Sequence, residues 1–532
     1  MPRSLSGRSL PAPTSSAPRL PSRSLAWVSA LGAGCCALLL SVNARAAGQL
    51  GPDGTPIQTS DFALDVFTGP VLGGSRMTGL AGAYSAIAEG TDGNLVNAAS
   101  AAVRPFYSLD HFDYWLGFGL TLPALSEMDY FNTGTRDPSQ EQTSQFLYLA
   151  PALNLQFGTF GVGMTVEYQR FAVDASTSSG QLVTTVTTSH LQFANGFLGG
   201  QLVAGMGTRA VNLSAADESC EGQRLVECSM EGRADKGSSF TSFGFGPEIG
   251  VLVKPFDLPF RAGLSYRGAI KTDPKFTDNF LPNSSGDITI PGVDGDPFYL
   301  PRRVELPWDV NLGFAFQFGR PFNPRWRRPE DISEKELLHL RLAAIEIEER
   351  RDRELSTIVD PAERKVVTAR YAQELARNAE LVDATMTRAR AKQQKELAYW
   401  DRFYVLVASS LTITGPIENG VGMESYVNQE VVRSGVKTSY SPHFAVESEA
   451  IPDWLKLRSG FYIEPARSSG ATPRGHATFG ADIRTINFDV FGLWPKDYIW
   501  GIGGFADIAP RYVTWGFSLI GWYPRHQKSE YE

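Results

Sequence analysis

The stretch "LPWDVNLGFAFQF", Leu306 to Phe318, decides between two folds. A large apolar residue recurs at every second position, and the residues between are small or polar. This repeat indicates a β-strand with two unlike faces, because successive side chains of a strand point to opposite sides. Such a strand fits a soluble sandwich, whose apolar face meets a core, and also an outer-membrane barrel, whose apolar face meets lipid. The apolar set is Trp308, Val310, Leu312, Phe314, Phe316 and Phe318, and the set between them is Asp309, Asn311, Gly313, Ala315 and Gln317.

The length of this strand is compatible with the barrel. A strand of about eleven residues at roughly 3.3 Å each reaches about 36 Å. Tilted by about 40°, it rises about 28 Å, which is close to the ~25 Å apolar band of outer-membrane barrels. The composition agrees, because a hydrophobic fraction of 42% is too low for a bundle of membrane helices and suits strands that are apolar on one side.

The composition and motifs also exclude several functions. The formal net charge of -8 argues against a nucleic-acid partner, since such proteins carry basic patches. The glycines of "GFGPEIG" (Gly244–Gly250) have the wrong spacing for a dinucleotide-binding loop and are expected to be strand glycines. No phosphate-binding loop or serine-nucleophile motif occurs in the sequence. We therefore expect no enzymatic activity, no catalytic residue and no cofactor.

The same alternation recurs in a hairpin at Leu153–Tyr168, in the pair Phe243–Val253 and Phe260–Ile270, and in Tyr512–Tyr523. On the less apolar face, charged and polar side chains alternate with glycine. An arginine at mid-depth would cost roughly 2–4 kcal/mol against lipid but little in a wet lumen. This difference in free energy determines which residues of each strand face the lumen. The residues predicted to face the lumen are Glu167, Glu248, Arg261, Arg267, Asp309 and Asn311.

Connection lengths alternate too, as they do in barrels with short periplasmic turns and long outer loops. The expected long loops are 171–189, 214–239, 271–305 and 415–440. We predict an all-β transmembrane barrel of about 14 antiparallel strands in the bacterial outer membrane, with its parts at residues 106–329 and 401–523. Aromatic residues near strand ends are predicted to form interface girdles. They are Trp400, Tyr404, Trp494, Tyr498, Trp500, Trp522 and Tyr523.

Residues 330–400 break the strand pattern and predict a helical hairpin. Ser333 and Glu336 have the spacing of a capping box, and Asp360 with Pro361 predicts the start of a second helix. Leu338, Leu342 and Ile345 are expected on the apolar stripe of the first helix. The strand count places this hairpin in the periplasm. Its charged surface is expected to be either a solvated face or a docking surface for a periplasmic protein.

The N-terminus resembles an export signal. Basic residues precede the apolar run 25–42 and the cleavage pattern Ala44-Arg45-Ala46, so we predict a signal peptide at 1–46, with a retained anchor helix as the alternative. In an exported chain, Cys220 and Cys228 are expected to form a disulfide. Metal binding at these cysteines is not expected, because no histidine lies near them. Asp287, Asp294 and Asp296 could hold calcium between outer loops, but a solvated acidic loop is the favoured interpretation and no metal site is predicted. Residues 524–532 form a polar tail.

The stretch "RMTGLAGAYSAIAEGTDGNLVNAASAA" (Arg76–Ala102) resembles the N-terminal signature of the FadL/TodX-type outer-membrane transporters of long-chain fatty acids and aromatic hydrocarbons. The chain departs from that signature at Asn97-Ala98-Ala99, where the family has proline after asparagine. The resemblance implies a barrel with an N-terminal hatch or plug, here residues 47–105, and passage of hydrophobic ligands from the outer loops to a lateral or luminal exit. The matching signature residues are Gly79, Gly82, Ala83, Tyr84, Ala86, Asp92 and Asn97.

Two functions remain open at this point. The first is passive uptake of small hydrophobic molecules, either fatty acids or aromatic hydrocarbons, by a barrel that contacts outer-membrane lipid. The second is a structural or assembly barrel that recruits a periplasmic partner through residues 330–400.

Overall fold

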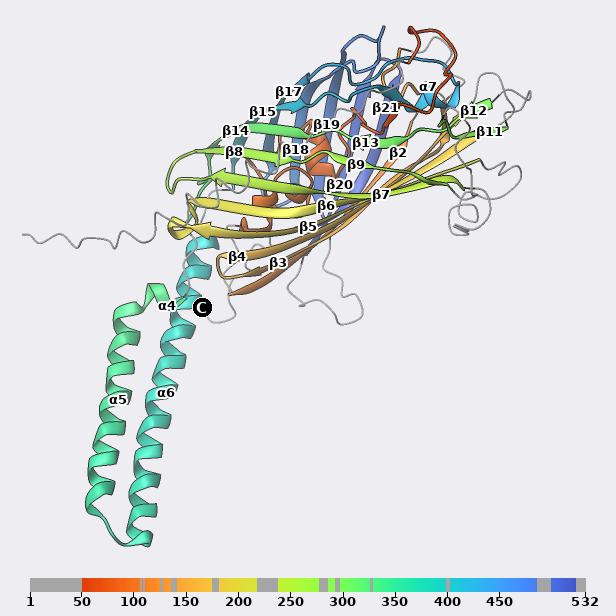
Figure 1. The fold of residues 1–532 in the computed structure, drawn as a ribbon. Helices are drawn as coiled ribbons and strands as arrows, with labels where there is room; N and C mark the ends of the chain where they lie inside the picture. Colours follow the sequence, from red (N-terminus) through yellow and green to blue (C-terminus); the bar gives the residue numbers. More distant parts are fainter. Residues whose placement is uncertain are drawn as a thin grey trace, which may run out of the picture. The chain divides into compact units, whose positions relative to one another are not determined.

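The computed structural model describes residues 50–522 except for short internal gaps (Figure 1). The expected signal peptide, the pair Cys220 and Cys228, and the polar tail lie outside the described residues. The gaps are 106–107, 109–110, 125–127, 135–140, 175–180, 218–237, 277–285, 292–296, 326–328, 399–401 and 486–498.

The molecule is built on a closed barrel of 14 antiparallel strands, which confirms the predicted fold class. Neighbours in the barrel are neighbours in the sequence, and the pairing of β7 with β8 and of β2 with β21 completes the ring. The strands are β2 (Phe112–Pro123), β3 (Glu141–Phe157), β4 (Phe160–Asp174), β5 (Gln181–Phe197), β6 (Leu202–Asp217), β7 (Ser238–Val253), β8 (Phe260–Arg267), β14 (Asp309–Gly319), β15 (Tyr404–Thr414), β17 (Ser439–Ile451), β18 (Leu455–Glu464), β19 (Arg474–Arg484), β20 (Ile499–Ala509) and β21 (Tyr512–Trp522).

The two faces of strand β14 distinguish a membrane barrel from a soluble sandwich. Its phenylalanines point outward, with Phe314 53% and Phe318 59% exposed, whereas Asn311 and Gln317 are buried inside the barrel. An exterior of exposed aromatic and aliphatic side chains around a polar interior is the arrangement of a barrel in lipid. Exposed aromatics also ring the end with the short turns. They are Phe112, Phe157, Phe160, Phe197, Phe318, Phe403 and Trp454. The protein is an outer-membrane barrel.

The girdle predicted from the sequence is wrong for three of its members. Tyr404 and Trp522 are buried because each is in phase with the inward-facing residues of its strand. Trp500 is also buried, although it shares the phase of the outward-facing Ile502 on β20. The other four predicted girdle residues lie outside the described residues. The girdle that the structure shows comes from residues adjoining the turns instead.

Two strand predictions also need correction. Most of the expected loop 171–189 is strand, because β4 and β5 pair from Phe160 opposite Asn195 up to Asp174 opposite Gln181. This part of β5 is rich in threonine, which is polar but β-branched and favours strands. The first barrel strand begins at Phe112 rather than near residue 106.

Segments far apart in the sequence close the long-loop end of the barrel. We call them the outer cap. In it, β1 (Ala63–Asp65) pairs in parallel with β13 (Arg303–Leu306) and β16 (Gly420–Gly422), and β9 (Ile270–Thr272) extends the sheet. Helix α7 (Met423–Val427) contacts β16 and β1. Buried apolar side chains such as Phe62, Leu64 and Tyr426 form the core of the cap.

Separately from the outer cap, short helical elements lie inside the barrel (Figure 1). They are α2 (Ser75–Gly79), η2 (Asp92–Leu95) and η3 (Ala98–Ala102), and we call residues 66–105 the luminal segment. Element η3 contacts β4, β5, β6 and β7, and α2 contacts β18, β19 and β20 on the other side of the ring. The segment therefore crosses the lumen from wall to wall.

A helical hairpin follows β14, formed by α4 (Pro329–Ile332), α5 (Glu334–Thr357) and α6 (Pro361–Ala398). It is connected at the short-turn end, because Gly319 and Tyr404, which flank it, pair with each other. The start of β2 and the end of β21 belong to the same end, which single-chain bacterial barrels place in the periplasm. No helix among the described residues is long and apolar enough to cross a membrane.

Two predictions made for the hairpin, the apolar stripe of its first helix and the cap at Ser333, are wrong. The expected stripe of Leu338, Leu342 and Ile345 is more than half exposed, and the helices pair instead through Ile347 against Val367 and Tyr371. The side chain of Ser333 makes no capping hydrogen bond, because α4 directly precedes it and the helix has no free start there.

The start of the second helix follows the prediction, since Asp360 accepts a hydrogen bond from the backbone N–H of Ala362 at 3.1 Å. The hydroxyl of Tyr371 and the guanidinium of Arg370 donate to Glu354 on the facing helix. These hydrogen bonds lower the pKa of the Glu354 carboxyl.

Candidate functional site

Glycines on the inner face of the wall allow the luminal segment to lie directly against it. A Cβ atom at Gly161 would stand 1.9 Å from the carbonyl oxygen of Ala101, and one at Gly263 would stand 2.1 Å from that of Ser85. Any other residue at these positions would overlap the backbone of the segment. The inner-face glycines of the strand pattern are therefore where the wall and the luminal segment meet.

Ion pairs also hold the luminal segment to the wall. Arg76 donates to Glu447 of β17 at 2.8 and 2.9 Å, and also to Glu89 at 2.8 Å. The other oxygen of Glu89 accepts from Arg261 of β8 at 2.8 Å. Arg458 of β18 then joins Glu447 at 3.0 Å. Strands β8 and β17, which are separated in the ring by β14 and β15, are thus linked through the luminal segment.

The seven signature residues all lie in this segment, and Ala86 is among its buried residues. Gly79 stands close to Gly480 of β19, and Gly82 has a positive φ of 72°. Ala83 is buried, and the Tyr84 hydroxyl donates to the backbone of Glu89 at 2.8 Å.

Asp92 accepts from the backbone N–H of Met77 at 3.2 Å. Asn97 caps η3 through the N–H of Ala99 and donates to Ser85 at 3.0 Å. Asp92 and Asn97 thus hold the backbone of the segment in place.

The six residues predicted to face the lumen lie on the inner side of their strands. Arg267 donates to Asp309 at 2.8 Å and to the backbone of Leu95. Arg261 also reaches the backbone of Ile87. Glu167 and Glu248 hold His190 between them, at 2.8 and 2.9 Å. Asn311 donates to Thr412 at 2.8 Å.

A cavity of about 210 Å³ lies inside the barrel, on the side of the luminal segment that faces the outer cap. Its lining mixes apolar side chains with the charged groups of the inner wall. The apolar residues are Val66, Phe67, Leu72, Met77, Leu95, Val96, Val186 and Val211, and the charged ones are Glu167, Arg209, Arg267 and Asp309.

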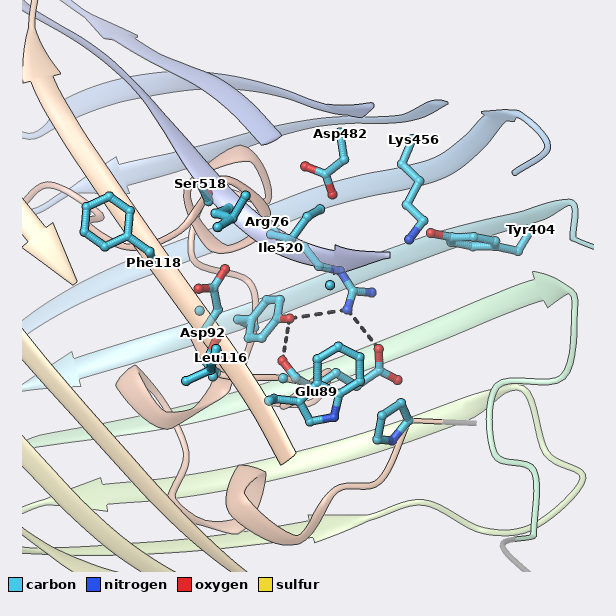
Figure 2. Close-up of a pocket in the computed structure, with 18 of the residues that line it drawn as sticks. Arg76, Glu89, Asp92, Leu116, Phe118, Tyr404, Lys456, Asp482, Ser518 and Ile520 are labelled. Carbon is cyan, nitrogen blue, oxygen red and sulfur yellow. Dashed lines mark hydrogen bonds and ion pairs between the residues drawn. The ribbon is translucent and has the colours of Figure 1, made fainter. Parts of the chain in front are cut away.

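A second cavity of about 160 Å³ lies at the seam between the first and last strands (Figure 2). The pairing of β2 with β21 ends at Phe118 opposite Leu519, although β2 begins at Phe112 and β21 continues to Trp522. Four consecutive residues of β2, 115–118, line this cavity although they alternate between the two faces of the strand. The cavity therefore passes through the wall.

The luminal segment separates the two cavities. Met77 and Leu95 line the inner cavity, whereas Arg76, Tyr84 and Asp92 line the seam cavity. Figure 2 shows Arg76 with its ion pair to Glu89 among the residues that line the seam cavity, together with Leu116, Phe118 and Ile520. A molecule passing from one cavity to the other must displace this segment or slip past it.

No cluster of metal-ligating side chains occurs among the described residues. The carboxylate of Asp287 accepts from Thr59 and from the backbone of Ser60, so its role there is to hold the outer cap.

Comparison with known proteins yields matches among solved structures alone. No family model matches the chain, and no curated protein does. The CymD monoaromatic hydrocarbon channel is 11% identical, with a TM-score of 0.42, over 86% of this chain and 99% of the other. A Pseudomonas aeruginosa FadL homologue is 12% identical, with a TM-score of 0.42, over 87% and 100%. A mutant of the TodX monoaromatic hydrocarbon channel is 12% identical, with a TM-score of 0.39, over 84% and 96%.

Sequence reasoning missed the seam and most of the residues around it. Leu116, Gly521 and Lys456 carry no motif, and the alternation of β2 continues unbroken through the unpaired part. Only the strand pairing reveals that β2 and β21 part there. Arg209 was also missed, although it alternates with small residues on β6 in the same way as the charges that were found.

Proposed function

We propose that this barrel passively carries small hydrophobic molecules, such as aromatic hydrocarbons or fatty acids, across the outer membrane. The observation that supports this is the pair of cavities on either side of the luminal segment, the second of which passes through the barrel wall. An apolar molecule leaving through the wall would enter the hydrocarbon of the membrane rather than water.

In this proposal the luminal segment acts as the hatch, within the N-terminal domain 47–105 expected from the sequence. Its ion pairs hold it closed, and a ligand in the inner cavity competes for the apolar contacts of Met77 and Leu95. The exit is the seam, where Leu116 and Phe118 present an apolar lip. The pathway needs no catalytic residue, since the ligand moves down its own concentration gradient.

Blocking the seam tests the proposal. Leu116→Cys, in a background with Cys220→Ser and Cys228→Ser, is modified with a bulky maleimide after reconstitution into liposomes, and uptake of radiolabelled toluene and of a labelled fatty acid is measured. The matched control is Phe314→Cys, which is exposed on the lipid face of β14 away from the seam. We expect modification at Leu116 to abolish most uptake and modification at Phe314 to leave it unchanged.

Two results would contradict the proposal. Uptake no faster than in protein-free liposomes would remove transport itself. Uptake that persists after complete modification of Leu116→Cys would remove the seam as the exit and leave the luminal route.

A second candidate function rests on the hairpin. The exposed stripe Leu338, Leu342 and Ile345 is flanked by Lys335 and Arg341 near its start. The next turns of α5 carry acidic residues, Glu346, Glu348 and Glu349. We propose that a helix of a periplasmic protein, with an apolar stripe and the opposite order of charges, docks here.

Crosslinking tests this docking. A photocrosslinking residue replaces Leu342 in cells, with and without the charge reversals Lys335→Glu and Arg341→Glu. The docking proposal expects a crosslink to an acidic stretch of a partner helix, weakened by the reversals. A crosslink to a second copy of this chain, or none, would refute it. Deleting residues 329–398 should remove the partner and leave uptake intact.

A further inference from the structure

Arg209 stands apart from the other charges of the inner wall. It lies on β6, points inward, is 6% exposed and lines the inner cavity. Among the described residues it makes one hydrogen bond, from Nη2 to the backbone oxygen of Gly268 at 3.2 Å, and its buried Nε has no partner. A guanidinium has five N–H donors, so most of them have no acceptor here.

The neighbouring carboxylates do not fill this gap, because each already has other partners. Each lies on a strand of the inner wall near β6, and each is held at hydrogen-bond distance by another side chain. The pairs are Glu167 with His190 and Tyr148 at 2.8 Å each, Glu248 with His190 and Gln192 at 2.9 Å each, and Asp309 with Arg267 at 2.8 Å. Buried charged donors without acceptors are costly, so a group from outside the wall would stabilise Arg209.

The rest of the cavity sets the size and polarity of such a group. The apolar lining, with Val186 and Val211 on the same part of the wall, suits a hydrocarbon body. Cavities of about 150 Å³ bind benzene, so a cavity of about 210 Å³ accepts one ring with a short substituent. A long acyl chain would not fit within it.

We propose that the inner cavity selects small organic acids, with a single ring or a short chain, whose carboxylate is bound by Arg209. The planar guanidinium suits a carboxylate, and the surrounding side chains hold the apolar body. This inference rests on the proposed transport function and names its substrate class. Neutral molecules of the same size enter the cavity but form no ion pair with Arg209, so this residue does not increase their affinity.

Uptake into liposomes tests the inference with two probes of nearly equal size, radiolabelled benzoate and radiolabelled benzyl alcohol. The full-length protein is compared with Arg209→Met, with Arg209→Lys, and with Arg377→Met, which removes an arginine from the exposed surface of the hairpin. Folding of each variant is checked by the heat-dependent shift of the barrel in gel electrophoresis.

We expect Arg209→Met to raise the half-saturating benzoate concentration by about ten- to a hundredfold, the usual range for losing a charged hydrogen bond. Benzyl alcohol uptake should not change, Arg209→Lys should restore part of the benzoate preference, and Arg377→Met should behave as the unaltered protein. Equal handling of both probes by the unaltered protein and by Arg209→Met would overturn the inference and leave transport standing. Failure of both probes to enter would overturn the transport proposal with it.

Discussion

At the scale of single residues, Glu89 shows how the luminal segment is held. Each of its two carboxylate oxygens accepts from a different arginine, Arg76 within the segment and Arg261 on the wall. Arg261 is 3% exposed and has backbone oxygens and Asn323 as its other acceptors. Removing the charge of Glu89 therefore leaves a buried cation without its counter-ion.

Glu89→Gln keeps the shape of the side chain and removes its charge. We expect it to destabilise the luminal segment by about 1–3 kcal/mol, because charged hydrogen bonds contribute in that range. Proteolysis of the folded barrel in detergent measures this, since a loosened segment 66–105 becomes accessible to protease. Glu396→Gln, on the exposed surface of α6, is the control. Equal protease resistance in Glu89→Gln and the unaltered protein would refute the expectation.

Sequence alternation identified the face of five inner charges, but not their partners. The five are Glu167, Glu248, Arg261, Arg267 and Asp309. Arg261 and Glu89 are 172 positions apart, and nothing in either segment specifies the other. The unpaired N–H donors of Arg209 are harder to predict, because they are unpaired only since the neighbouring carboxylates already bind other side chains. Pairing in a lumen depends on which strands curve toward one another, and this is set by the closed ring.

At the scale of elements, the strands were predictable and the helical hairpin less so. A period of two assigns each residue to one of two faces, and lipid and lumen differ strongly enough to fix the choice. On α5, apolar residues occur on more than one face: Leu337 and Ile347 are buried, Ile347 against α6, whereas Leu338 and Leu342 are more than half exposed. Periodicity alone could not tell which stripe meets the partner helix.

A pair of alanine substitutions separates the two stripes. Ile347→Ala should cost the hairpin about 2 kcal/mol or more, since its side chain is buried between Val367 and Tyr371. Leu342→Ala, on the exposed stripe, should change stability by less than about 0.5 kcal/mol. Thermal scans of the full chain that follow the helical circular dichroism signal measure both. A larger effect at Leu342 than at Ile347 would show that the exposed stripe is packed in solution.

At the scale of the whole molecule, the outer cap and the luminal segment together block the lumen. The glycines of the inner wall fit this blockage, because they leave the space that the segment occupies. The resemblance at Arg76–Ala102 implied a plug inside the barrel, but the sequence could not say which residues of the wall the plug contacts. The sequence could not predict the seam, because an unpaired strand edge has the same alternation of apolar and polar residues as a paired one.

Gly263→Val tests the blockage. Its Cβ would fall 2.1 Å from the backbone of Ser85, so the segment must shift away from the wall, at about 1–3 kcal/mol for overpacking. We expect an increased ion conductance in planar bilayers. Leu264→Val, the next residue on the same strand but on the lipid face, is the matched control and should not conduct more than the unaltered protein. Unchanged conductance in Gly263→Val would mean that the segment does not obstruct ions.

The central strand of the outer cap has a consequence for biogenesis. Residues 63–65 sit between 303–305 on one side and 420–422 on the other. These contacts join the beginning of the barrel chain to its middle and to its last third, and such distant contacts form slowly because a long loop must first be closed. Residues 63–65 therefore cannot form both of their strand pairs until residues 420–422 have reached the assembling barrel. A chaperone that shields residues 50–72 during this delay should speed maturation more than one that acts on the late strands.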